Sequence, residues 1–205
     1  PSQQVNTFTL GDQFLPSITT LNDGDVVVTW QSLNQDGSGW GIYAQIVGPD
    51  ATPHGTEFRV NTTTTANQLG SSVVKMADGG FVVTWASDGQ DGDNYGIYGQ
   101  RFDSAGHSVG SEFQVNTATA GLQDQPNIIG LSGGGFVVAF NSPNSDSRGV
   151  FAQVYDADSH PVGGQFELNT TTAGDQNNVA LSALHDGGFV AVWQSQPSNP
   201  ADAGA

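Results

Sequence analysis

The sequence Gly80-Phe81-Val82-Val83-Thr84-Trp85 decides the fold of this 205-residue chain. Successive side chains of a strand point to opposite faces, so Phe81, Val83 and Trp85 share one face and Val82 lies on the other. Both faces are apolar, and a strand of this kind must be covered on both sides of its sheet. The Asp-Gly-Gly sequence at 78–80 is typical of the tight hairpin turn that precedes such a strand.

This strand sequence belongs to a repeat with a period of about 55 residues. Closely similar sequences occur at spacings of 55, 55 and 53 residues, at 26–30, 81–85, 136–140 and 189–193. Three other elements keep the same spacing: 5–7, 60–62, 115–117 and 168–170; 17–21, 72–76, 127–131 and 179–184; and 41–45, 96–100 and 149–153. Each unit therefore contains four short β-rich runs separated by Gly, Asp, Asn and Pro, which indicates four antiparallel strands joined by turns.

The length of the unit and the two apolar faces of its strand select the architecture. A two-sheet sandwich leaves one face of each strand in water, and a solenoid repeat usually has about 20 to 30 residues, whereas a propeller blade has neighbours on both faces. We therefore predict an all-β, propeller-like array of four-stranded antiparallel blades in a single repeat domain spanning 1–205. Its complete blades are expected at 8–62, 63–117 and 118–170, with partial blades at 1–7 and 171–205.

The chain opens with the last strand of one unit and finishes after the second strand of another. This phase resembles a ring in which both termini complete one blade, but Pro197, Pro200 and the lack of an apolar run over 194–205 do not favour a further strand there. Two alternatives remain open, a piece of a longer repeat array and a part-ring. In a part-ring, unpaired blade edges would associate with another copy, giving a homo-oligomer.

Composition excludes several classes of function. The chain has 20 acidic and 4 basic residues and a net charge of -16, and a surface of this sign repels nucleic acids and anionic lipids. The apolar runs are far shorter than a membrane-spanning helix requires, so we predict no membrane insertion. The absence of cysteine excludes thiol catalysis, disulfides and cysteine-bound zinc. Low lysine with abundant Asp, Asn, Thr and Gly is typical of an exported bacterial protein.

The loop between the second and third runs of each unit is rich in oxygen donors. Ca²⁺ binds carboxylate, amide and carbonyl oxygens, and glycine lets a loop wrap around the ion. These loops are therefore candidate calcium sites, and their carboxylates are Asp36, Asp88, Asp91, Asp93 and Asp146. The alternative is that they form solvated Asp-Gly turns, which the same residues also favour.

One repeat position just before the third strand carries Trp40, Tyr95 and Arg148. Aromatic rings beside carboxylates and amides can stack on sugar rings or anchor a protein partner. These three residues are therefore candidate ligand-binding residues. Alternatively, each ring packs over its own hairpin or the neighbouring blade.

Nucleophile and phosphate-binding motifs are absent from the sequence. His54, His107 and His160 recur in equivalent turns, which indicates turn formation rather than catalysis. Glycoside cleavage by paired carboxylates would require a cleft whose acids break the repeat symmetry.

The sequences Gly-Gly-Phe-Val-Val-Thr-Trp (79–85), Tyr-Gly-Ile-Tyr-Gly-Gln-Arg-Phe-Asp (95–103) and Glu-Phe-Gln-Val-Asn-Thr (112–117) resemble the tandem repeats of large secreted bacterial proteins. Such repeats often accompany haemolysin-type calcium-binding (RTX) segments. The resemblance implies export, a propeller-like repeat and adhesion.

We therefore predict a non-enzymatic, extracellular, lectin-like binding or adhesion module that presents Trp40 and Tyr95 to a glycan or a cell-surface protein, with Ca²⁺ as the ordering ion. Two alternatives are a structural spacer of a larger exported protein and a propeller-fold glycoside hydrolase or lyase.

Overall fold

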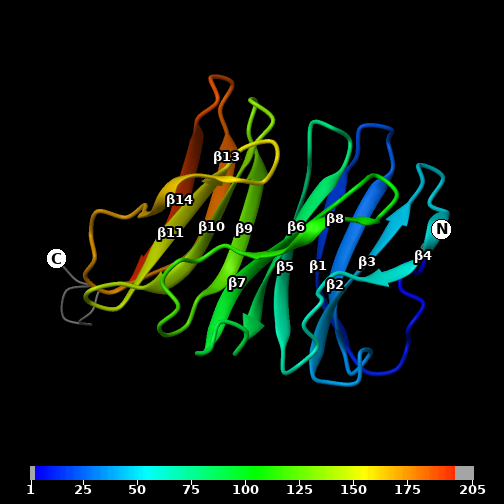
Figure 1. Ribbon diagram of the computed structural model, residues 1–205, viewed down its shortest axis with the longest axis horizontal. Helices are drawn as coiled ribbons and strands as arrows, with labels where there is room; N and C mark the ends of the chain where they lie inside the picture. Colours follow the sequence, from blue (N-terminus) through cyan, green and yellow to red (C-terminus); the bar gives the residue numbers. More distant parts are fainter. Residues whose placement is uncertain (1–2, 197–205) are drawn as a thin grey trace.

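The computed structural model describes residues 3–196, which form fourteen β-strands joined by turns (Figure 1). Unit 1 contains β1 (Gln13–Thr20), β2 (Val26–Leu33), β3 (Trp40–Val47) and β4 (Pro53–Arg59). Unit 2 contains β5 (Gln68–Lys75), β6 (Phe81–Asp88), β7 (Tyr95–Phe102) and β8 (Ser108–Gln114). Unit 3 contains β9 (Asp124–Gly130), β10 (Phe136–Pro143), β11 (Arg148–Tyr155) and β12 (Pro161–Glu167), and unit 4 contains β13 (Asp175–Ala183) and β14 (Phe189–Gln196).

Each of units 1 to 3 is a four-stranded sheet in which neighbouring strands run antiparallel, and unit 4 is an antiparallel hairpin. Unit 4 is joined to unit 3 by a single parallel bridge between Arg148 and Asp175. The predictions of an all-β chain and of four-stranded antiparallel sheets are confirmed. The units stand side by side in chain order, with unit 1 at one end of the array and unit 4 at the other, so the described sheets do not close into a ring (Figure 1). The prediction for residues 197–205 lies outside the described residues.

The hydrophobic core lies between the units. Phe81, Val83 and Trp85 of β6 pack against unit 1 in a cluster with Val27 and Ile42. Val82, on the other face of β6, packs in a second cluster with residues of unit 3 that include Phe136 and Val138. These four side chains are all 0% exposed, so the prediction that both faces of β6 are covered is confirmed.

A repeated Asn–Gln pair organises each connection into the next unit. In the first of these, the Asn61 side-chain amide donates to Gln68 Oε1 over 3.1 Å, and Asn61 Oδ1 accepts from the Ile42 N–H over 2.7 Å. The same pair recurs as Asn6–Gln13, Asn116–Gln123 and Asn169–Gln176. Because the asparagine also binds the third strand of its own unit, the connection is held against the sheet it leaves.

The first strands of the units, β1, β5, β9 and β13, are here called the inner strands, because each contacts the inner strand of the next unit. The Val73 N–H donates to Ser17 Oγ and the Ile128 N–H to Ser72 Oγ, both over 3.3 Å, which ties successive inner strands together. Each inner strand has a register shift near its start, and a residue with positive φ lies there: Leu15 (50°), Gly70 (64°), Gln125 (53°) and Asn178 (55°).

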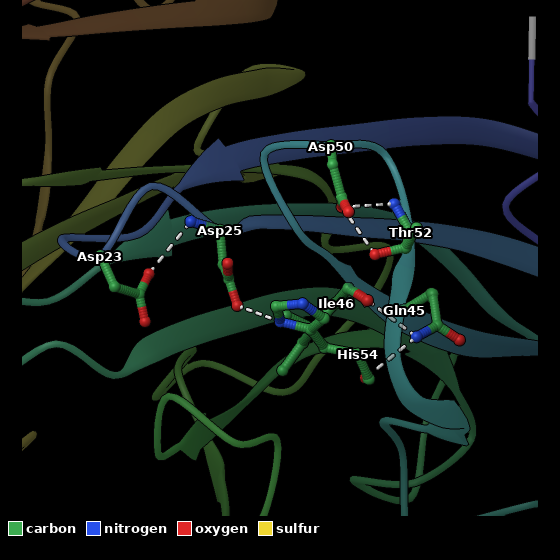
Figure 2. Close-up of polar contacts among 7 residues, drawn as sticks. All are labelled: Asp23, Asp25, Gln45, Ile46, Asp50, Thr52 and His54. Carbon is green, nitrogen blue, oxygen red and sulfur yellow. Dashed lines mark hydrogen bonds and ion pairs between the residues drawn. The ribbon is translucent and has the colours of Figure 1, made fainter.

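His107 and His160 lie in the turns that precede β8 and β12, whereas His54 lies on β4 itself, so the prediction that the three histidines occupy equivalent turns is wrong for His54. His54 Nδ1 lies 2.6 Å from Asp25 Oδ2, and the Gln45 side chain donates to the carbonyl oxygens of Ile46 and His54 (Figure 2). His107 and His160 pair differently, with Asp103 and Asp156, which lie four residues earlier in the same turn. These contacts hold turns in place, and the three histidines lie in three separate units.

Candidate functional site

The loops between second and third strands lie at the same end of the sheets as the connections between units. In unit 2 the Gly121 N–H donates to Asp93 Oδ2 over 2.8 Å, and in unit 3 Thr172 Oγ1 donates to Asp146 Oδ2 over 2.6 Å. Each loop therefore contacts the connection that leads into the next unit. We call this end of the array the loop end.

The candidate calcium carboxylates serve as hydrogen-bond acceptors at the loop end. Asp91 Oδ2 accepts from the Asn116 side chain over 3.2 Å, and Asp36 Oδ1 accepts from the Ser38 N–H over 3.1 Å. The main-chain N–H groups of Gly121 and Asn94 lower the pKa of Asp93. Asp88 is half-buried at the end of β6, opposite Tyr95.

The structure does not bring these carboxylates together in one group. Within residues 3–196 the one group of three acidic or histidine side chains with metal-binding spacing is Asp156, Asp158 and His160, in the β11–β12 turn. That turn is not one of the loops to which the sequence assigned Ca²⁺. Calcium at the loop end stays a prediction.

The residues predicted to bind a ligand lie opposite a second repeat position near the start of the inner strand. That position carries Phe14, Leu69 and Asp124 in units 1 to 3. Trp40 packs against Phe14, with 5.6 Å between the ring centroids, so its ring covers its own unit. Tyr95 and Leu69 line one pocket in unit 2. In unit 3 the corresponding residues are Arg148 and Asp124, and they form an ion pair. An aromatic–apolar pair in units 1 and 2 is therefore replaced by a charged pair in unit 3.

The Asp124–Arg148 pair is the centre of a polar cluster that sequence reasoning missed. Asn141 lies opposite Asp124 in the β9–β10 ladder and is 0% exposed. Its amide donates to Gln125 Oε1 over 3.0 Å, while Asn141 Oδ1 and Arg148 Nε are buried without a protein partner. Buried atoms without a protein partner also occur in the other units, at Trp30 Nε1 and Arg101 Nε for example, so they do not by themselves distinguish this cluster.

A second carboxylate, Asp175, lies on the other side of Arg148. Its backbone pairs with that of Arg148, and the Ser147 hydroxyl donates to its carboxylate. Asp124 has no acidic equivalent in units 1 and 2, whereas the repeat position of Asp175, just before the glutamine of the Asn–Gln pair, is also acidic in unit 1, as Asp12. We call Asp124, Asn141, Ser147, Arg148 and Asp175 the acidic site.

A pocket of about 370 Å³ opens beside Asp124, between the inner strands of units 1, 2 and 3. Its polar lining includes Gln31, Tyr95, Asp124 and Gln125, and leucine side chains from each of the three units complete it. Burial raises the pKa of Tyr95, so its phenol is a neutral hydroxyl at physiological pH. A ring face, a carboxylate and two amides on an apolar floor are suited to hold a sugar.

A larger pocket of about 610 Å³ lies between the outer strands of units 1 and 2, but its chemistry is less suited to catalysis. Its one acid, Glu112, accepts from the Thr62 N–H and Oγ1, both over 2.8 Å, and from the Gln90 side chain. This carboxylate is therefore used in joining the two units. Glu57 binds Thr7 in the same way in unit 1.

Neither protein-family models nor curated protein sequences match this chain. Solved structures do. An endo-arabinase from Bacteroides thetaiotaomicron has a TM-score of 0.57 at 14% identity, over 94% of this chain and 75% of that one. An α-L-arabinofuranosidase from Lactobacillus brevis has a TM-score of 0.56 at 11% identity, over 90% and 65%. A protein of unknown function from Dyadobacter fermentans has a TM-score of 0.67 at 10% identity, over 93% and 63%.

These similarities concern the fold, and this chain spans about two thirds to three quarters of the lengths of those chains. They nevertheless correct one prediction. The sequence led us to expect a non-enzymatic module, whereas the similar solved structures include an arabinase, an arabinofuranosidase and an endo-1,4-β-xylanase. The prediction rested on the absence of a nucleophile motif, and two carboxylates from different strands leave no such motif.

No helix long and apolar enough to cross a membrane occurs in the part of the chain that the structure describes.

Proposed function

We propose that the chain is a propeller-type glycoside hydrolase unit that cleaves a polysaccharide outside the cell, with the acidic site as its active site. The observation that carries this proposal is the break in repeat symmetry. Asp124 and Asp175 flank Arg148, whereas the equivalent of Asp124 is Phe14 in unit 1 and Leu69 in unit 2. The export implied by the repeat sequences supports an extracellular polymer as substrate.

Glycoside cleavage by two carboxyl groups needs one that is ionised and one that donates a proton. We assign Asp124, which is ion-paired with Arg148, the carboxylate that stabilises the positive charge developing on the sugar ring. Asp175, whose carboxylate accepts from the Ser147 hydroxyl and has no basic partner, is assigned the general acid. Asp175 gives a proton to the glycosidic oxygen as the bond to the anomeric carbon breaks, the leaving sugar departs as an alcohol, and a water molecule then adds to the anomeric carbon and returns a proton to Asp175.

The neighbouring pocket supplies the binding surface for the sugar. Tyr95 offers its ring face, and Gln31 and Gln125 offer amide groups at the same pocket.

The experiment is release of reducing sugar from arabinan, arabinoxylan and xylan by the purified chain. We expect Asp124→Asn and Asp175→Asn each to lower kcat by roughly 10²–10⁴-fold, the usual contribution of a positioned acid or base. Tyr95→Ala is expected chiefly to raise KM. Asp158→Asn, at an exposed position in the β11–β12 turn, is the matched control and is expected to leave the rate unchanged.

Three results would refute the proposal. The first is that no polysaccharide in the panel is cleaved or bound by a chain whose circular dichroism and melting are those of a folded protein. The second is cleavage that persists at the parent rate in Asp124→Asn and Asp175→Asn. The third is binding without cleavage, because the two carboxylates would then have no chemical role.

A further inference from the structure

The outer face of unit 4 is apolar and exposed in the described structure. Val190 is 47% and Val192 is 61% exposed. In units 1 to 3 the equivalent positions are 0% exposed, because the next unit covers them: Val27, Val82 and Val137 for Val190, and Thr29, Thr84 and Ala139 for Val192. Unit 4 therefore presents a face that every earlier unit buries.

The opposite end of the array presents the complementary face. Ile18 on β1 is 67% exposed, whereas its equivalents Val73 and Ile128 are 7% and 5% exposed. Phe14 on the same strand is 52% exposed. In units 2 and 3 this face is covered by the preceding unit, as the cluster of Val73 with Val27 and Ile42 shows.

The two exposed faces are thus the two halves of one interface that the array already makes three times. The face of one unit that carries Val27, Val82 or Val137 always packs on the face of the next that carries Phe81, Phe136 or Phe189. Unit 4 offers the first kind of face and unit 1 the second. Their shapes and chemistry are therefore matched by the repeat itself.

The open part of the unit 1 face lies on β1. The N-terminal segment covers the rest of the face, since Thr7 is bound to Glu57, and Val5 lies with Val28 and Trp30 around one pocket and with Val47 around another. No residue of β2 is exposed, whereas Phe14, Leu15 and Ile18 of β1 are 52%, 61% and 67% exposed. The inner strand of unit 1 is therefore the surface that a second copy would cover.

The sequence of unit 4 is not adapted to solvent at this face. Val192 is more apolar than Thr29, Thr84 or Ala139, although those three are fully buried. A face that stays in water gains nothing from an added aliphatic side chain, and contiguous apolar surfaces of this kind mark interaction sites.

We propose that two copies of this chain associate head to tail, with the outer face of unit 4 of one copy packed on the free face of unit 1 of the other. The two faces of one copy cannot meet each other, because unit 1 and unit 4 stand at opposite ends of the array (Figure 1). The contact is heterologous, so association proceeds either to a closed ring or to longer assemblies. This inference does not depend on the catalytic proposal.

The test uses Val192→Glu and Ile18→Glu, which place a charge on one face each. Both positions are well exposed, so the fold tolerates the change. By sedimentation velocity and light scattering we expect the parent chain to form dimers or larger assemblies as concentration rises. Each variant alone is expected to lose association by roughly a hundredfold or more, because a buried unpaired charge opposes the contact. Val162→Glu, 54% exposed on the outer strand β12, is the matched control and should associate as the parent does.

Mixing the two variants tests the head-to-tail geometry. Val192→Glu keeps an intact unit 1 face and Ile18→Glu keeps an intact unit 4 face, so a mixture has one working interface. We expect the mixture to form a 1:1 heterodimer and nothing larger. A parent chain that stays monomeric up to near-millimolar concentration would overturn the proposal. So would a mixture that fails to pair, or an Ile18→Glu variant that still self-associates.

Discussion

Replacing Asp124 and Arg148 by the residues that unit 2 has at the equivalent positions tests the role of the ion pair in stability separately from its role in catalysis. The changes are Asp124→Leu and Arg148→Tyr, which reproduce Leu69 and Tyr95 at the equivalent positions. The side chains of Arg148 and Asp124 are only 26% and 25% exposed, so each single change leaves a largely buried charge without its partner. Breaking a fully buried pair in this way costs about 3–5 kcal/mol. The remaining exposure lowers our expectation to about 2–3 kcal/mol for each single variant.

The double variant is expected to behave differently. Replacing a buried ion pair by packed apolar side chains is often neutral or stabilising, by up to about 4 kcal/mol. The frame of unit 2 already accommodates a leucine and a tyrosine at these positions, so we expect the double variant to be at least as stable as the parent. The coupling energy between the two changes should then be about 4 kcal/mol or more.

Urea denaturation followed by tryptophan fluorescence gives the four free energies of unfolding in this cycle. Polysaccharide cleavage, measured on the same four proteins, should be lost in both single variants and in the double variant. Additive effects on stability would refute the reasoning that the pair is a coupled replacement. A double variant that is fully active would refute the assignment of the active site.

The two remaining predictions concern the packing between units and the acid limit of stability. Val82→Ala and Val83→Ala, which act on opposite faces of β6, should each cost about 2–3 kcal/mol of unfolding free energy, from lost burial of two methyl groups and the cavity left behind. Val109→Ala, at a 46% exposed site on β8 of the same unit, should cost under about 1 kcal/mol, and a cost as small as this at position 82 or 83 would mean that one face of β6 is open. Burial raises the pKa of Asp78, but the hydrogen bond and the charge of Arg101 outweigh that effect, and the net pKa is lowered from 3.8. The stability that Asp78 contributes is therefore present above its unfolded pKa and is lost as pH falls below about 4, so Asp78→Asn should flatten that part of a pH titration of the melting temperature. If the melting temperature of Asp78→Asn fell below about pH 4 as steeply as that of the parent, Asp78 would not contribute to stability in this way.

The periodicity of the sequence was sufficient to predict the sheets. A strand such as 81–85, apolar on both faces, requires two neighbours, and the 55-residue spacing shows that the neighbours are copies of itself. The register shift in each inner strand was not predictable in the same way. Gly70 indicates a left-handed residue by its type, but the same conformation is adopted by Leu15, Gln125 and Asn178 in the other units. Only the surrounding sheet imposes that geometry on residues that do not favour it.

The site was predictable in part. The position shared by Trp40, Tyr95 and Arg148 lies at the loop end, beside the proposed acidic site, but the sequence does not tell which side chain faces each of them. That partner comes from the inner strand, 24 to 26 residues earlier in the chain. Trp40 packs against the ring of Phe14, and Arg148 forms an ion pair with Asp124. The signal for Asp124 was nevertheless present, because it is an acid at a position that is apolar in units 1 and 2.

Packing between the units favours the same residues in every unit, whereas a selective ligand site requires residues that differ between units. The contacts that stabilise each unit require the same residue types at the same positions, as the Asn–Gln pairs and the valines of β2, β6 and β10 show. A ligand site that distinguishes one sugar from another needs groups that are not repeated, because identical units would offer identical, equivalent surfaces. A charged residue can replace an apolar one at a buried repeat position only if an oppositely charged residue is introduced beside it. A carboxylate alone at the position of Leu69 would lose its hydration without compensation. Asp124 and Arg148 satisfy this condition together. Their joint departure from the repeat is therefore the feature of unit 3 on which the proposed active site rests.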